Sequence, residues 1–131
     1  MNCNVFGFFT SMEERFFIFA EIFYAMADLT QTQWAEKLAN DDNAVIVDVR
    51  TQLEVEEGYI PNMIHLDIFN AGAFMDAARE MDPTKNYFVY CKSGARSGQA
   101  CAILNSLGFK NAYNLMGGFL NWEGKKTTLN Q

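Results

Sequence analysis

The feature that most constrains the fold is a regular alternation, after residue 28, of short apolar runs with longer amphipathic stretches. Four apolar runs predict strands, at residues 44–49, 63–66, 86–90 and 111–115. Five stretches predict helices, at residues 30–38, 51–57, 71–80, 97–107 and 119–122. Strands that alternate with helices predict an α/β fold, in which a central parallel sheet carries helices on both faces.

The first part of the chain differs from the rest because aromatic residues dominate residues 5–27 and charged residues interrupt them. We expect residues 1–27 to be an appendage to a single domain at residues 28–131, and whether the appendage is disordered stays open. An amphipathic surface helix at residues 11–27 ranks second. A signal peptide ranks third, on the small-x-small pattern at residues 25–27, and would make the protein periplasmic. No run reaches the roughly 18 apolar residues of a membrane span, so a membrane partner is disfavoured.

Charge and cysteine content exclude several classes. The formal net charge of −6 argues against a nucleic-acid partner, which needs clustered Lys and Arg. The three cysteines are Cys3, Cys91 and Cys101, with no C-x-x-C pair, so neither a disulfide framework nor a metal site is expected. Free thiols fit a reducing, cytoplasmic compartment. Residues 1–91 hold 5 basic and 15 acidic side chains, whereas residues 92–131 hold 5 basic and 1 acidic.

The segment that follows the third predicted strand has the composition of an anion-binding loop. It contains Cys91, Lys92, Ser93, Gly94, Ala95, Arg96 and Ser97. Ligands of parallel α/β folds bind where strands end and helices begin, which is the predicted place of Cys91. Small residues and Gly94 allow the loop to curl, so that its N–H groups surround an anion. This loop and the charges of Lys92 and Arg96 predict a low pKa for the Cys91 thiol.

This loop resembles the active-site loop of the rhodanese family of single-domain thiosulfate sulfurtransferases. Two further motifs strengthen the resemblance, which covers residues 29 to about 124. Residues 48–50, Asp-Val-Arg, followed by Glu54 and residues 57–61, are similar to the family's strand-end "DVR" and its "E-x-G-H-I-P" stretch. Residues 117–122 are similar to its "GG-x-x-x-W" signature. Two positions depart from the pattern: Tyr59 replaces the usual His and Asn62 the usual Gly.

The resemblance implies a rhodanese-like α/β fold and a sulfur-transfer mechanism. Cys91 would take sulfur from thiosulfate or a persulfide, become a persulfide, and pass the sulfur to a thiol or cyanide; a protein acceptor is also left open. The family uses no metal and no organic cofactor. The loop N–H groups would hold the charge and Arg96 would orient an anionic donor, while Asp48 and Arg50 would brace the loops.

Two rival functions remain at this point. A phosphatase or arsenate reductase of the same fold is disfavoured, because four residues separate Cys91 from Arg96 where the related phosphatases have five. A non-enzymatic sulfur carrier or redox sensor needs the same reactive thiolate, so the sequence does not separate it from an enzyme. We interpret His65, the only histidine, as a hydrogen-bonded structural residue and Cys101 as a core residue.

Overall fold

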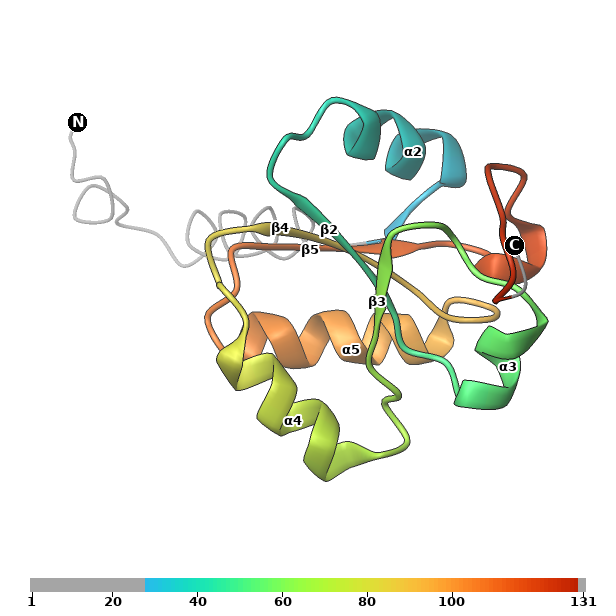
Figure 1. The fold of residues 1–131 in the computed structure, drawn as a ribbon. Coiled ribbons are helices and arrows are strands. Elements are labelled where there is room, and N and C mark those ends of the chain that lie inside the picture. The colour runs from blue at the N-terminus through green and yellow to red at the C-terminus, as the bar shows by residue number, and fades with distance from the viewer. Residues whose placement is uncertain (1–27, 130–131) are drawn as a thin grey trace, which may run out of the picture.

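A sheet of five parallel strands forms the centre of the fold in a computed structural model that describes residues 28–129. The strands are β1 (Asp28–Leu29), β2 (Ala44–Asp48), β3 (Met63–His65), β4 (Asn86–Tyr90) and β5 (Asn111–Leu115). The helices are α2 (Gln31–Ala39), α3 (Gln52–Glu57), α4 (Ala71–Glu80), α5 (Ala95–Ser106) and the 3-10 turn η2 (Phe119–Asn121). The strand order is β1-β5-β4-β2-β3, which places β4 in the middle (Figure 1).

Helices cover both faces of this sheet, with α2 above it and α4 and α5 below it in Figure 1. Successive side chains of a strand point to opposite faces, so β4 contributes to two cores. Phe88 and Tyr90 pack with Trp34 of α2, whereas Val89 and Cys91 pack with residues of α4 and α5. The expected α/β architecture, a parallel sheet with helices on both faces, is confirmed. Cys91 lies within the core below the sheet.

Most elements lie where periodicity and capping residues predict them. Thr30 and Thr51 both form capping boxes, because each hydroxyl accepts an N–H three residues later and that residue's side chain accepts the threonine N–H. The predicted helix at residues 97–107 instead begins at Ala95, because Gly94 adopts φ 109° and serves as its N-cap. The last predicted helix is a single 3-10 turn. The sequence pattern missed β1, since two residues carry no periodicity.

The predicted appendage, residues 1–27, lies outside the described residues, and its boundary at residue 28 stays a prediction. In the portion that the structure describes, no helix has both the length and the apolar character needed to cross a bilayer.

Candidate active site

Cys91 lies directly after β4, at the carboxyl edge of the sheet, and its side chain is fully buried. The chain then turns sharply through Gly94, whose φ of 109° favours a residue without Cβ. This turn brings the Gly94 N–H to 3.0 Å from Cys91 Sγ, and the Ser97 hydroxyl oxygen lies 3.3 Å from the same sulfur. The loop therefore curls around the cysteine sulfur, and a main-chain N–H donates to that sulfur.

The surroundings lower the pKa of the Cys91 thiol. Burial raises this pKa, but hydrogen bonds from the Ser97 side chain and from the main chain of Ser97, Gly94 and Ser93 outweigh burial. The direction agrees with the sequence-based expectation, whereas the cause differs in part. Hydrogen-bond donors, rather than the charges of Lys92 and Arg96, are the main stabilisers of the thiolate.

Arg96 is held by a carboxylate from another segment of the chain. Its two terminal nitrogens donate to the two carboxylate oxygens of Glu54 at 2.8 and 2.9 Å, and its guanidinium lies 5.2 Å from the Phe69 ring centroid. The hydrogen bond from Arg96 is the largest cause that lowers the pKa of Glu54 to about 2. The fork expected to orient an anionic donor is thus occupied by Glu54 in this structure.

The double-glycine turn after β5 is joined to the cysteine loop by main-chain hydrogen bonds. The Phe119 N–H donates to the Cys91 carbonyl at 2.8 Å, and the Leu120 N–H donates to the Lys92 carbonyl at 3.0 Å. A Cβ on Gly118 would lie 2.3 Å from the Lys92 carbonyl oxygen, a distance that no side chain tolerates. Only glycine permits this close approach of two main chains, which gives the "GG-x-x-x-W" pattern a physical reason.

Asp48 and Arg50 form a buried ion pair at the end of β2. The Arg50 Nη2 atom lies 2.7 Å from Asp48 Oδ2, and the same nitrogen donates to the Gly58 carbonyl at 2.7 Å. The guanidinium also lies over the Phe119 ring, 4.4 Å from its centroid. Since Phe119 itself donates to the Cys91 carbonyl, this pair connects the end of β2 with the cysteine loop.

Asn114 of β5 is a site residue that the sequence analysis missed. Its side chain is buried, its Oδ1 atom contacts the Ser97 hydroxyl, and its Nδ2 atom donates to the Gly94 carbonyl at 3.1 Å. The same Nδ2 atom donates to Asp28 Oδ1 at 2.7 Å. A polar residue inside an otherwise buried strand is the signal that could have found it, because such a residue requires hydrogen-bond partners.

The remaining candidates have structural roles. His65 Nε2 donates to the Arg50 carbonyl at 2.6 Å, in keeping with a hydrogen-bonded structural histidine. Cys101 lies in the core of α4 and α5, where burial raises the pKa of its thiol to about 12. In residues 28–129, no group of three or more His, Cys, Asp or Glu side chains comes together as a metal-binding cluster.

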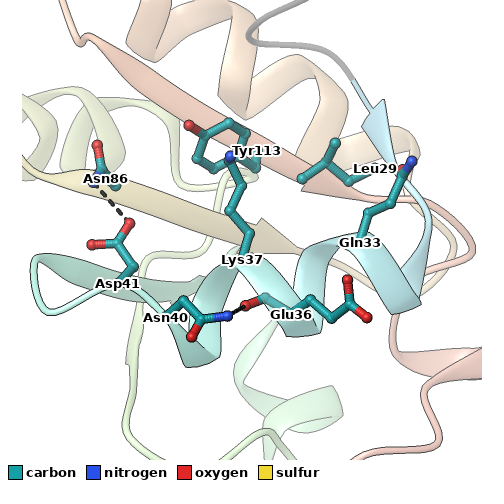
Figure 2. Close-up of a pocket in the computed structure, with 8 residues that line it drawn as sticks. All are labelled: Leu29, Gln33, Glu36, Lys37, Asn40, Asp41, Asn86 and Tyr113. Carbon is teal, nitrogen blue, oxygen red and sulfur yellow. Dashed lines mark hydrogen bonds between the residues drawn. The ribbon is translucent and has the colours of Figure 1, made fainter.

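Two hollows differ in their relation to Cys91. A hollow of about 240 Å³ lies beside the loop and is lined by Arg50, Glu54, Glu57, Lys92, Phe119 and Leu120. A wider one of about 660 Å³ lies along α2 (Figure 2). Its residues Leu29 and Tyr113 belong to the core on the other face of the sheet from the core that contains Cys91. There Asp41 accepts a hydrogen bond from Asn86, and the Lys37 nitrogen lies over the Tyr113 ring. The smaller hollow, beside the cysteine loop, is therefore the candidate place for a ligand.

The fold and the loop define a class: α/β proteins that hold a cysteine in a strand–loop–helix turn at the end of a central parallel strand. A family model described as "Rhodanese-like domain" matches residues 31–125. The chain belongs to the rhodanese-like domain family, as the motifs indicated.

Individual relatives agree with this assignment. The putative sulfurtransferase YtwF of Bacillus subtilis is 37% identical over 90 residues, which cover 69% of this chain and 84% of the relative. The thiosulfate sulfurtransferase GlpE of Coxiella burnetii is 35% identical over 94 residues, covering 72% and 85%. The crystal structure of a rhodanese-like domain protein from Staphylococcus aureus superposes with a TM-score of 0.63 at 29% identity, covering 76% of this chain and 95% of that one.

Proposed function

We propose that the protein is a sulfurtransferase, which carries sulfane sulfur from thiosulfate or a persulfide to a thiophilic acceptor as a Cys91 persulfide. The observation that carries the proposal is the 3.0 Å hydrogen bond from the Gly94 N–H to Cys91 Sγ. Such donors keep a thiolate available near neutral pH, and the thiolate is the form of cysteine that attacks sulfur. The sulfurtransferase names of the relatives support the same reaction class.

With thiosulfate as the donor, the reaction has two balanced steps. The Cys91 thiolate attacks the outer sulfur of thiosulfate, a new sulfur–sulfur bond forms, and sulfite leaves with the electron pair of the broken bond. Cyanide or a thiolate then attacks the outer sulfur of the persulfide, and Cys91 leaves as the thiolate. The chain's own part is to stabilise negative charge at Sγ in both steps, through Gly94 and its neighbours.

The other loop residues have supporting parts in this proposal. Lys92 lines the 240 Å³ hollow and supplies positive charge where an anionic donor would enter. Arg96 acts by fixing the loop to Glu54, and its Nη1–Nη2 side meets a donor only if that ion pair opens. Ser93 and Ala95 are small and allow the turn. The ion pair of Asp48 and Arg50 supports Phe119, whose N–H donates to the Cys91 carbonyl.

The test is the mass of the protein after incubation with thiosulfate. We expect a gain of one sulfur atom that peptide mapping places on Cys91. The variant Cys91→Ser should gain no sulfur and should lose thiosulfate:cyanide activity, whereas the control variants Cys3→Ser and Cys101→Ser should keep both properties. Transfer that survives in Cys91→Ser would falsify the proposed mechanism.

A sulfur carrier or redox sensor remains the second candidate. The observation that favours it is the bidentate pair between Arg96 and Glu54, which occupies the Nη1–Nη2 side of the guanidinium and leaves fewer donors for thiosulfate. The two functions differ in turnover. A carrier would form the Cys91 persulfide once and keep it in the presence of cyanide, whereas an enzyme would release thiocyanate through many cycles.

A further inference from the structure

The orientation of the Asn114 side chain is fixed by its neighbours. Its Nδ2 atom donates to the Asp28 carboxylate at 2.7 Å and to the Gly94 carbonyl at 3.1 Å. Both partners are acceptors, so the amide nitrogen must face them and the amide oxygen must face Ser97. A side-chain amide oxygen only accepts hydrogen bonds. The hydrogen between Asn114 Oδ1 and Ser97 Oγ therefore comes from the serine hydroxyl.

The Ser97 hydroxyl has one hydrogen and two neighbours that can accept it. Asn114 Oδ1 is closer than Cys91 Sγ, which lies 3.3 Å from the hydroxyl oxygen. When Cys91 is a neutral thiol, its own S–H can donate to Ser97 Oγ, and every group in the chain is satisfied. When Cys91 is a thiolate, it also competes for the hydroxyl hydrogen, and a hydroxyl turned toward the sulfur leaves the buried Asn114 oxygen without that hydrogen bond.

We propose that Asn114 is a positioning residue that competes with the Cys91 thiolate for the Ser97 hydroxyl hydrogen and so limits the acidity of Cys91. The Gly94 N–H donates to the sulfur whichever way the hydroxyl points, so it sets the base level of acidity. The charged and titratable groups near this chain of bonds are Asp28, Arg96 and Cys101. They stay in place whichever way the Ser97 hydroxyl points.

The proposal predicts that Asn114→Leu, a substitution of similar size, makes the Cys91 thiol more acidic rather than less acidic. Without the competing oxygen, the hydroxyl is free for the thiolate, so the pH midpoint of Cys91 alkylation should fall by about 0.5 to 1 unit. A purely structural role predicts the reverse, because a disturbed loop would lose the Gly94 donor and raise the midpoint. The control is Asn111→Leu on the same strand, which removes a side-chain hydrogen bond to Asn86 and should leave the midpoint unchanged.

A double-mutant cycle assigns the effect to Ser97. Ser97→Ala should raise the alkylation midpoint, because the thiolate loses a donor. In the Ser97→Ala background, Asn114→Leu should shift the midpoint little, since the hydrogen for which Asn114 competes is gone. An unchanged or raised midpoint in Asn114→Leu, or an equal shift in both backgrounds, would overturn the proposal.

A second experiment leaves Asn114 unchanged and therefore still applies if Asn114→Leu does not fold. It measures the hydrogen bond between the Cys91 thiol and Ser97. At low pH the Cys91 S–H should donate to Ser97 Oγ, and this hydrogen bond lowers the S–H stretching frequency in the infrared spectrum. Loss of the band in Cys91→Ser assigns it to Cys91. Ser97→Ala should move the band to the frequency of a free thiol, and a band that does not move would contradict the proposed arrangement.

Discussion

At the residue scale, the pair between Glu54 and Arg96 links α3 to the first turn of α5, close to Cys91. Both side chains are mostly shielded from solvent, so the two hydrogen bonds are stronger than those of an exposed pair. The carboxylate also accepts the Thr51 N–H and hydroxyl, which fixes its direction. One side chain therefore caps a helix and holds Arg96.

This pair makes the stability of the protein depend on pH in acid. The pKa of Glu54 is lowered from 4.5 to about 2, chiefly by Arg96, so its contribution is complete above pH 4.5 and is lost as the pH falls through about 2. Glu54→Gln should therefore lower Tm at pH 7 and have a much smaller effect near pH 2. Arg96→Met should show the same trend, because it removes the cause. Thermal unfolding across this range checks the prediction, and a difference in Tm that stays constant would contradict it.

At the scale of elements, the loops at the carboxyl edge of the sheet are held by buried contacts rather than by exposed ones. The pair of Asp48 and Arg50 is the clearest case, since Asp48 is fully buried and Arg50 is 3% exposed. Breaking such a pair leaves a charge without a partner in the interior.

We expect Arg50→Met to lower the free energy of unfolding by about 3–5 kcal/mol, because Asp48 would then be buried and unpaired. Arg79→Met is the matched control, since Arg79 pairs with Asp76 in solvent at 3.8 Å, and its removal should change stability little. Urea unfolding of both variants measures the difference. Similar losses for the two arginines would show that burial does not govern the Asp48 pair.

The turn at Gly118 gives a second prediction for an element. Gly118→Ala would place Cβ against the Lys92 carbonyl and force apart the two main chains that position Cys91. A displacement of this size should lower kcat/KM for sulfur transfer on the order of 100-fold. Gly72→Ala on α4 is the control, because no atom lies within 4 Å of its added Cβ, and full activity is expected. Thiosulfate:cyanide kinetics measure kcat/KM for both variants. Equal activity in the two would contradict the role proposed for Gly118 in positioning Cys91.

Much of the architecture could be predicted from sequence because its causes are local. Periodicity and turn-forming residues predict the bounds of three elements as the structure has them, at residues 71–80, 86–90 and 111–115. The partners within the site depend instead on which strands are neighbours. Asn114 meets Ser97 because β5 lies beside β4, a consequence of strand order rather than of nearby sequence.

Arg96 illustrates the same limit at the site itself. Its residue type indicates a planar, cationic group close in sequence to the thiol. Its partner, Glu54, lies 42 positions away, and the sequence gives no spacing rule for such a contact. The sequence therefore predicts only the anion-binding chemistry of Arg96, whereas its pairing with Glu54 depends on the fold.

At the scale of the whole molecule, the family match at residues 31–125 lies within the domain proposed for residues 28–131. We therefore expect a chain that begins at residue 28 to keep the Tm and the activity of the full chain nearly unchanged. Calorimetry and sulfur-transfer assays of the two chains, side by side, test this boundary. A clear drop in Tm, or loss of cooperative unfolding, would show that the aromatic residues before residue 28 belong to the folded unit.

The support that the Cys91 loop receives from Asn114 and Gly118 has a consequence during protein synthesis. Both residues lie later in the chain than Cys91, so they leave the ribosome after it. Until the segment through Leu120 has emerged and docked, the Cys91 and Lys92 carbonyls lack the two main-chain donors that hold them in the folded protein. A nascent chain would thus complete the support of its Cys91 loop only after residue 120 has emerged, when all five strands of the sheet have also been synthesised.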